Sequence, residues 1–312
     1  MTVPPPAPEF CTEVGPQCPV EGTLYGYYPS IGWNGFFAGF FGLCLIIQLG
    51  LGIRYKTWSY MIALCFGCLG ELIGYIGRIM LWNNPFDSLG FQIQICCLII
   101  SPAFISGGIY LTLKHIVANF GEKWSRLRPG WYTWVFISCD IFSLVLQGSG
   151  GGIAATADSG SDMQDVGTNL MIAGVIFQVV ILVVFGYLLA EYAFRTYRRR
   201  DHLSADSLRL FNQRSFRLFA LAIFVAYITI LVRCGYRIPE LTGGWRSELM
   251  RNEAEFIALE GVMIVIAVLV LTIFHPGYCF PALASTFGKN KAQREKTMDR
   301  DSDVEMMSNH NA

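Results

Sequence analysis

Seven long apolar runs, separated by short polar connections, dominate the chain. They cover about residues 31–53, 57–80, 89–113, 131–149, 166–192, 216–236 and 254–275. Each is long enough to cross a bilayer, because about 20 apolar residues in a helix span the hydrocarbon core. The pattern predicts an all-α bundle of seven transmembrane helices at residues 31–277. Flanking it are tails at 1–30 and 278–312, the latter expected to be disordered after about residue 288.

The composition agrees with a polytopic membrane protein. Of the 312 residues, 53% are hydrophobic and only 15% are charged, and the mean hydropathy is +0.44. The formal net charge is zero, so no overall field favours binding of nucleic acid. The first thirty residues show no basic segment followed by a short apolar core. We therefore expect no cleavable signal peptide, with the first span as the targeting signal.

Basic residues alternate between the connections. Lys and Arg number two at 54–56, none at 81–88, four at 114–130, none at 150–165 and seven at 195–217. Because basic connections stay in the cytosol, the alternation predicts an extracellular N-terminus and a cytosolic C-terminus. The sixth connection is an exception, with Arg246 and Arg251. We expect these arginines to pair with nearby acids drawn from Glu240, Glu248, Glu253 and Glu255.

Two segments outside the spans have features of their own. In an extracellular tail, Cys11 and Cys18 are expected to form a disulfide, and two free thiols are the alternative. The fifth connection interleaves basic and apolar residues. This pattern suits either a segment lying on the anionic cytosolic leaflet or a plain solvated loop.

The second run carries two charges inside its apolar sequence. On a helical wheel, Glu71 and Arg78 share an arc of about 120° with Gly67, Gly70, Gly74 and Gly77. Small residues let a neighbouring helix approach closely, and a charge at membrane depth costs about 2.5 to 3.5 kcal/mol unless it faces protein or water. We predict that this face points into the bundle. Each charge should find partners among Asp140, Gln147, Arg233, Arg237 and Glu260.

Further polar residues recur at membrane depth in the later spans. They are Asp140, Gln147, Gln178, Arg233, Arg237 and Glu260, and Glu240, just after the sixth span, is a further candidate site residue. These charges have two interpretations. They are either interhelical pairs that only hold the bundle together, or the lining of a polar path or headgroup site.

Glycine and proline predict interruptions of three spans. The glycine-rich run at 148–152 should end the fourth helix, and Pro239 should break the sixth before Glu240. Pro102 in the third span indicates a packing kink or, with the glycines at 107–108, a hinge.

Several chemistries are not indicated. The four histidines are scattered, and Cys65 and Cys68 form a CxxC without a second pair, so we expect no metal. The seventh span has no lysine for a retinal Schiff base, and no Walker-type loop is present. The sequence suggests no cofactor.

Eight phrases occur in a fixed order over about residues 22–280. They are YGYYPS (25–30), ELIGYIGR (71–78), SPAFISGGIY (101–110), CDIFSLVLQGSGGG (139–152), AGVIFQ (173–178), VRCGYRIPE (232–240), the stretch 253–260 and HPG (275–277). Together they resemble the fungal lipid-translocating exporter family, seven-span proteins whose members confer resistance to an aminosterol or to sphingoid long-chain bases. Ala258 and Glu260 stand where that family has an aromatic residue and often an aspartate, so the acid is kept.

The resemblance implies an exporter or flippase-like protein of the fungal plasma membrane that handles amphipathic lipids such as sphingoid long-chain bases. It would contribute to resistance against toxic amphiphiles. The alternative is a seven-span lipid-sensing receptor without transport activity. A membrane hydrolase is a third reading, which the missing histidine cluster opposes, so we expect no enzyme. The expected partners are membrane lipids or amphipathic small molecules, not nucleic acid.

Charge matching suggests how a headgroup would be recognised. In a low dielectric, the ammonium of a sphingoid base would meet a carboxylate from Glu71, Asp140 or Glu260. An anionic headgroup would instead be held by Arg78, Arg233 or Arg237.

Overall fold

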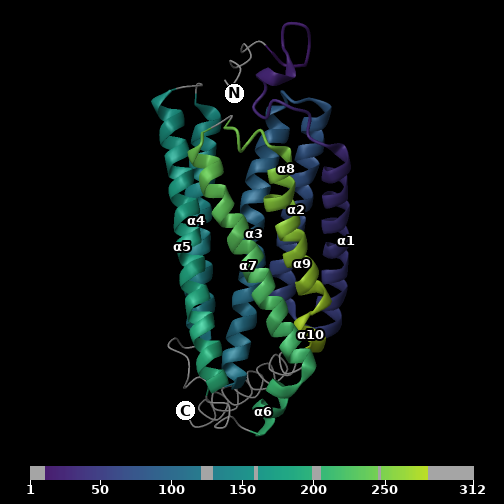
Figure 1. Cartoon of the computed structure of the whole chain (residues 1–312), viewed down its shortest axis with the longest axis vertical. Helices are drawn as coiled ribbons and strands as arrows, with labels where there is room; N and C mark the ends of the chain where they lie inside the picture. Colours follow the sequence, from purple (N-terminus) through teal and green to yellow (C-terminus); the bar gives the residue numbers. More distant parts are fainter. Residues whose placement is uncertain (1–10, 121–128, 158–160, 199–204, 245–246, 280–312) are drawn as a thin grey trace, which may run out of the picture.

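The structure is a computed structural model that describes residues 11–120, 129–157, 161–198, 205–244 and 247–279. These residues form helices and no β-strand. Seven helical segments in them are long and apolar enough to cross a membrane, which confirms the seven-span prediction. They are α1 (Ile31–Tyr55), α2 (Trp58–Asn83), α3 (Ser88–Phe120), α4 (Pro129–Thr156), α5 (Asp162–Arg198), α7 (Arg214–Thr242) and a seventh span at Glu253–Cys279 (Figure 1). The chain is a multi-pass integral membrane protein.

The seventh span is built from four pieces. They are α8 (Glu253–Glu255), a π-helical segment η4 (Phe256–Val262), α9 (Met263–Ile273) and α10 (Pro276–Cys279). Two short helices lie outside the spans, η1 (Val20–Gly22) in the N-terminal segment and α6 (Ala205–Asn212) in the fifth connection. The predicted disorder of the C-terminal tail falls on residues 280–312, outside the described part of the chain.

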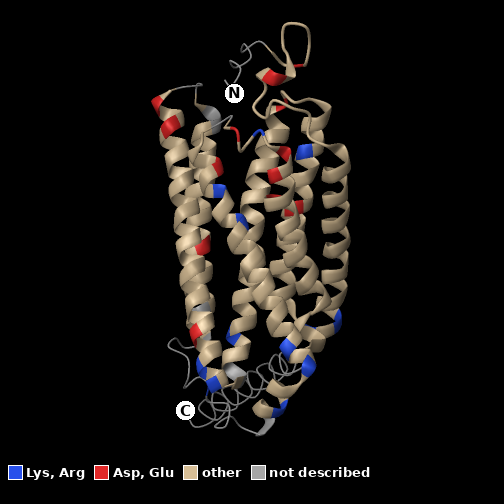
Figure 2. Cartoon of the chain, in the orientation of Figure 1, with Lys and Arg blue, Asp and Glu red and all other residues tan. Residues whose placement is uncertain are grey.

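The two ends of the bundle differ in charge. Residues 11–30 lie against one end, called here the outer end because the sequence predicts it to be extracellular (Figure 1). Lysines and arginines gather at the opposite, inner end, while acidic residues are frequent toward the outer end (Figure 2). This distribution is the one that the alternation of basic connections predicts for an inner, cytosolic face. The orientation in the membrane stays a prediction.

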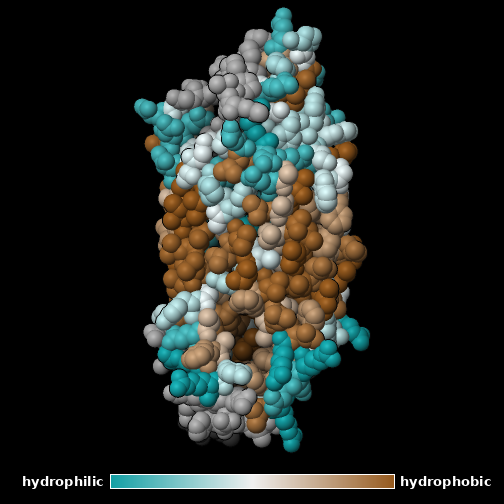
Figure 3. All heavy atoms as spheres, in the orientation of Figure 1, coloured by the Kyte–Doolittle hydropathy of each residue, from teal (hydrophilic) through white to brown (hydrophobic). Residues whose placement is uncertain are grey.

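The helices pack as two groups around α3. On one side α2 packs between α1 and α3, and on the other α4 and α5 form a closely packed pair. α7 contacts α9, α5 and α3. A broad apolar belt crosses the face of the bundle seen in Figure 3, between its polar ends, and side chains such as Ile46 and Val145 are more than half exposed. These side chains face the hydrocarbon of the bilayer.

The glycine face of α2 packs against α3, as predicted. A Cβ added at Gly74 would lie 2.6 Å from the Leu98 side chain, and one at Gly77 would lie 2.8 Å from the carbonyl oxygen of Gly90. Only glycine allows the two backbones to come this close. Glu71 and Arg78 are both fully buried, so neither faces lipid.

The prediction that residues 148–152 end the fourth helix is wrong. α4 continues through this run to Thr156. The reason is a close crossing with α5, where a Cβ at Gly150 would lie 2.6 Å from both the Gly167 carbonyl oxygen and the Met171 amide nitrogen. Packing against α5 offsets the low helix propensity of glycine, which costs about 1 kcal/mol per residue.

Pro239 does not break the sixth span either. α7 runs through it to Thr242, so Glu240 lies inside the helix and not in the following connection. The proline removes only one hydrogen bond, to the carbonyl of residue 235, and the helix ends three residues later, so few bonds depend on it. α3 likewise runs through Pro102, and whether that position acts as a kink or a hinge stays open.

Two of the acids expected to pair with the arginines of the sixth connection have other partners. Glu240 is carried into the bundle by α7, where Arg237 binds it, so that pairing was wrong. Glu253 Oε1 accepts a hydrogen bond from the Ser30 amide at 2.6 Å. The Arg251 guanidinium contacts the N-terminal segment, which it helps to hold on the outer end. Residue 246 lies outside the described part of the chain.

A buried charge cluster as the candidate functional site

Six charged side chains meet in the outer half of the bundle, and none is more than 6% exposed. They come from α2, α7 and η4 and comprise Glu71, Arg78, Arg233, Arg237, Glu240 and Glu260. Three are acidic and three are basic, so their formal charges cancel. Figure 2 shows charged residues along the outer half of the spans, which are otherwise largely apolar. We call this group the charge cluster.

Glu260 is the centre of the cluster. Its Oε1 accepts a hydrogen bond from Arg233 Nη2 at 2.5 Å and a second from Arg237 Nη2. Arg237 also donates to Glu240 Oε2 at 2.8 Å, and Arg233 donates to the Leu98 carbonyl oxygen at 2.6 Å. These bonds connect the seventh span to α7 and α7 to α3. These bonds offset part of the free-energy cost of removing each arginine from water.

The π-helical segment η4 positions Glu260. A π-turn adds one residue to the helix and rotates the side chains that follow it, and such segments are frequent at functional sites. Here Phe256 and Glu260 are both buried within η4. The sequence identified Glu260 as a membrane-depth acid but gave no sign of the π-turn that brings it to two arginines.

Glu71 has the weakest partners of the cluster. Its Oε1 lies 3.6 Å from Arg233 Nη2, an ion pair that confirms the predicted partnership with an α7 arginine. Neither carboxylate oxygen has a hydrogen-bond partner among the described residues. A fully buried carboxylate without hydrogen bonds is unfavourable, because desolvation is then only partly compensated. Glu71 therefore keeps acceptor capacity that the fold does not use.

Arg78 is held by aromatic rings. Its guanidinium carbon lies 3.6 Å from the centre of the Phe256 ring and 5.2 Å from that of Tyr25, and Nη2 donates to Tyr27 Oη at 2.8 Å. No carboxylate of the described residues forms an ion pair with Arg78, and its Nε and Nη1 have no hydrogen-bond partner there. The prediction that its partners come from the later polar residues was wrong. Cation–π contacts and a phenol take their place.

The N-terminal segment supplies two of these partners. Tyr25 Oη accepts a hydrogen bond from Gln94 of α3 at 2.8 Å. Burial raises the pKa of the Tyr25 and Tyr27 phenols, so both stay neutral beside Arg78. Gly26 between them has a φ of 73°, with Arg251 directly against it, and only glycine adopts this conformation without strain. The sequence did not indicate these tyrosines as partners of Arg78, although the glycine between them could have suggested a tight turn.

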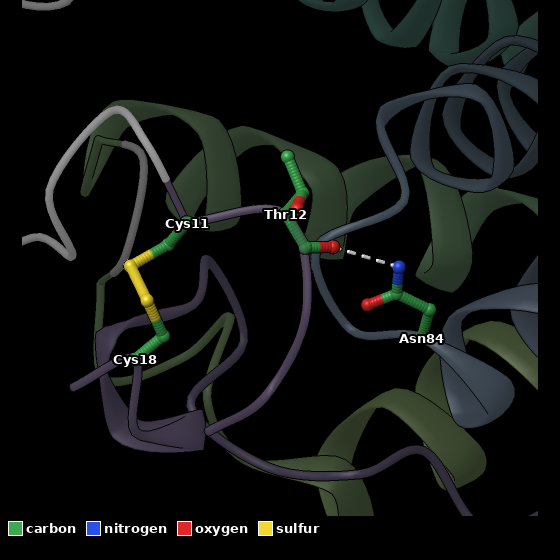
Figure 4. Close-up of a disulfide and its surroundings, with 4 residues drawn as sticks. All are labelled: Cys11, Thr12, Cys18 and Asn84. Atoms are coloured by element: carbon green, nitrogen blue, oxygen red, sulfur yellow. Dashed lines mark hydrogen bonds between the residues drawn. A yellow bond between two sulfur atoms is a disulfide. The ribbon is translucent and has the colours of Figure 1, made fainter. Parts of the chain in front are cut away.

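A disulfide and a hydrogen bond hold the start of this segment. Cys11 and Cys18 are joined, which is the pairing expected for an extracellular tail. Asn84, at the end of α2, donates to the Thr12 carbonyl oxygen at 2.9 Å (Figure 4). The segment is therefore attached to the outer end of the same helix that carries Glu71 and Arg78.

The other predicted site residues form separate contacts. Asp140 Oδ2 accepts a hydrogen bond from Ser106 of α3 at 3.1 Å, and Gln147 donates to Gln178 Oε1 at 3.0 Å. They do not reach Glu71 or Arg78 as partners. Both glutamines instead border a small cavity of about 10 Å³ whose other wall is formed by Arg233 and Arg237. The polar residues of α4 and α5 thus meet the charge cluster only across this cavity.

Comparison with known proteins identifies the family. The family model described as "RTA1 like protein" matches residues 64–283. The chain belongs to the RTA1-like family. The matched range contains every residue of the charge cluster, and it confirms the resemblance that the ordered phrases indicated.

Curated relatives are yeast proteins. The sphingoid long-chain base transporter RSB1 of Saccharomyces cerevisiae is 34% identical over an alignment of 286 residues, which covers 83% of this chain and 75% of the relative. Protein RTM1 of the same organism is 27% identical over 73% of each chain. Protoporphyrin uptake protein 1 is 26% identical over 66% of this chain and 65% of its own. No solved structure matches.

Proposed function

We propose that this RTA1-like protein exports or flips amphipathic lipids, sphingoid long-chain bases above all, across the fungal plasma membrane and so confers resistance to toxic amphiphiles. The observation that carries the proposal is the 34% identity over 83% of the chain with a protein named as a sphingoid long-chain base transporter. The same similarity favours transport over the alternative of a seven-span receptor without transport activity. The proposed activity needs no enzymatic step.

Recognition of the headgroup is assigned to Glu71. A sphingoid base carries an ammonium group and hydroxyls on a long chain. Glu71 offers two carboxylate oxygens without hydrogen-bond partners among the described residues, while Arg233 is already bound to Glu260 and to the Leu98 carbonyl. An ammonium in a low dielectric gains most from such a carboxylate. Tyr75, one turn along α2, has a buried hydroxyl without a partner there and suits a substrate hydroxyl.

Access to Glu71 requires a change of conformation. The side chain is fully buried, and the small cavity beside the cluster touches Arg233 but not Glu71 itself. Movement of Arg233 away from Glu71 would open the carboxylate to that cavity. The ion pair is the weak point for such a movement, because at 3.6 Å it is longer than the bond between Arg233 and Glu260.

The test uses purified full-length protein in liposomes and a fluorescent sphingoid base. Wild-type protein is expected to move the base between leaflets. Glu71→Gln should reduce that rate about tenfold or more, the loss expected when a charge-assisted contact is removed. Asp165→Asn, at the exposed outer start of α5, is the matched control and should keep the wild-type rate.

Other outcomes point elsewhere. Saturable binding without movement would support the receptor. Retained transport in Glu71→Gln, Asp140→Asn and Glu260→Gln, together with loss in Arg78→Gln or Arg233→Gln, would show that the recognised headgroup is anionic.

A further inference from the structure

An apolar crevice opens in the inner half of the bundle, away from the charge cluster. Its volume is about 470 Å³, within the range of ligand-binding cavities. α5 and α7 form its walls, α3 its floor and α6 part of its inner edge. Figure 3 shows a hollow at this level, in the region where Figure 1 places α5 and α7. The lining is almost entirely apolar and includes Leu113, Phe120, Leu189, Phe216, Ile223 and Tyr227.

The crevice opens sideways toward the bilayer. Tyr197, at the inner end of α5, and Phe224 of α7 border it, and they are 61% and 55% exposed. A hydrocarbon chain can therefore enter from the surrounding lipid without crossing water. Thr196 is one of the few lining residues with a hydroxyl; it is 8% exposed, and this hydroxyl has no hydrogen-bond partner among the described residues.

Two further cavities lie along the seam between α3 and α5, nearer the outer end, and neither shares a lining residue with the crevice. The small cavity beside Gln147 and Arg233 touches α3 at 99–102 and α5 at 175–178. A third cavity, of about 300 Å³, touches α3 at 91–96 and α5 at 164–171, and is also bordered by Gly148 and Gly152 of α4. The crevice itself touches α3 at 113–120 and α5 at 186–197. The three cavities thus follow one another from the inner to the outer half, and the middle one is far too small for a lipid headgroup.

The spacing along α7 connects the crevice to the charge cluster. Tyr227 borders the crevice and Arg233 borders the middle cavity. Six residues separate them, which is about 9 Å along a helix. A single-chain amphiphile whose chain lies in the crevice could therefore bring its headgroup to Arg233 and Glu71 once the side chains packed between the two cavities, Tyr110 and Phe185 among them, move aside.

We propose that the crevice is the chain-binding site for the sphingoid base. The base enters from the inner leaflet between α5 and α7 and leaves along the α3–α5 seam through the third cavity, called here the outer cavity. This inference rests on the proposed function and adds the site and the route. The occupant is a single hydrocarbon chain with a cationic head, because the walls are apolar and Glu71, the ion-pair partner of Arg233, has two carboxylate oxygens without hydrogen-bond partners among the described residues.

Photo-crosslinking of wild-type protein tests the site directly. Full-length protein in phosphatidylcholine liposomes is labelled with a long-chain base that carries a diazirine near the end of its chain, and the labelled peptides are mapped. Labels are expected on α5 around 186–197 and on α7 around 216–227. Unlabelled long-chain base should remove them, while extra phosphatidylcholine should not. Labels confined to other helices, or equal competition by phosphatidylcholine, would overturn the proposal, the latter because an ordinary membrane lipid would then be the occupant.

Substitutions that fill the crevice test its role in transport. Ala193→Trp and Ala220→Trp place a large ring among the lining residues, and Leu221→Trp, on the lipid-facing side of α7 at 57% exposure, is the matched control. We expect about a tenfold loss of labelling and transport in the first two, equivalent to burying about two fewer methylene groups, and no loss in the control. If a filled variant does not fold, the labelling map of the wild type decides.

The outcomes separate the two proposals. Wild-type protein that moves no base in liposomes contradicts the proposed function. Equal transport rates in wild type, Ala193→Trp and Ala220→Trp would contradict the crevice as the chain-binding site but not the proposed function. Gly152→Trp, which fills the outer cavity, should keep labelling in the crevice but lose transport, and equal transport would exclude the outer cavity from the route.

Discussion

The outer and inner halves of this bundle are held together in different ways. In the outer half, ion pairs centred on Glu260 cross between α7 and the seventh span, and glycines bring helix backbones into contact. In the inner half, aromatic and aliphatic side chains pack around Tyr110 and Phe185, and a crevice of about 470 Å³ stays open between α5 and α7. The outer half tolerates little displacement, whereas the inner half already has space for a lipid chain.

The difference has a physical cause. Buried charges are costly unless each has a partner in good geometry, so the helices that carry them are fixed by directional bonds. Apolar side chains inside a membrane gain little from packing on each other instead of on lipid, because lipid tails are equally apolar. A gap between α5 and α7 in the inner half therefore costs little, and lipid can fill it.

The largest expected effect is at Arg233 in the outer half. Arg233→Gln leaves Glu260 with one arginine fewer and Glu71 without an ion pair, so it should cost about 3 to 5 kcal/mol of stability. Thermal unfolding in detergent and the folded yield measure it. Arg195→Gln removes a partly exposed pair with Glu191 at the inner end and should cost less than about 1 kcal/mol. Equal losses of stability in the two variants would show that burial does not strengthen the ion pairs of Arg233.

Glycine crossings should give the next largest effect. Gly150→Ala places a methyl group 2.6 Å from backbone atoms of α5, which cannot move aside, and should cost about 1 to 3 kcal/mol. Gly152→Ala, two residues along the same helix and with nothing within 4 Å of its Cβ, should gain about 0.5 to 1 kcal/mol from helix propensity. Unfolding curves of the two variants measure the contrast. Identical behaviour would mean that α4 and α5 do not cross as closely as described.

A smaller loss of stability is expected at the aromatic residues that contact Arg78. Tyr27→Phe removes a hydrogen bond to a charged group and should cost about 1.5 kcal/mol, while the contact of Arg78 with Phe256 remains. Tyr28→Phe, at a side chain that is 46% exposed, is the control and should change stability by less than about 0.5 kcal/mol. Thermal unfolding of both variants measures the difference. A larger loss of stability in Tyr28→Phe than in Tyr27→Phe would contradict the assignment of Tyr27 as the partner of Arg78.

The smallest effect should come from the inner crevice. Ala193→Leu adds apolar atoms where space is open, so stability should change by less than about 0.5 kcal/mol. Ala226→Leu, at a fully buried position of α7 in the same half, should cost about 1 to 3 kcal/mol through overpacking. Thermal unfolding again separates them. A large loss in Ala193→Leu would mean that the crevice is closed in the folded protein.

Much of the architecture was readable from the sequence. Seven apolar runs gave the spans to within a few residues at most boundaries, because a membrane helix must satisfy all its backbone groups internally and be apolar over a fixed length. The glycines beside Glu71 and Arg78 gave the buried face of α2, because lipid excludes charge. The errors lay at positions 148–152 and at Pro239, where local propensity was outweighed by packing between helices.

The partners of the charges needed the tertiary structure. The sequence determined that Glu71, Arg78, Arg233 and Glu260 must be buried, since these four lie in apolar runs that have to cross the membrane, whereas Arg237 and Glu240 lie just beyond the sixth run. It did not determine that Arg78 would meet Tyr27 and Phe256, nor that a π-turn would bring Glu260 to Arg233 and Arg237. Nor does any spacing in the chain indicate the crevice between α5 and α7. Burial follows from local composition, which a sequence shows directly, whereas pairing and empty space depend on how separate helices rotate and cross, and those are set only when all seven pack together.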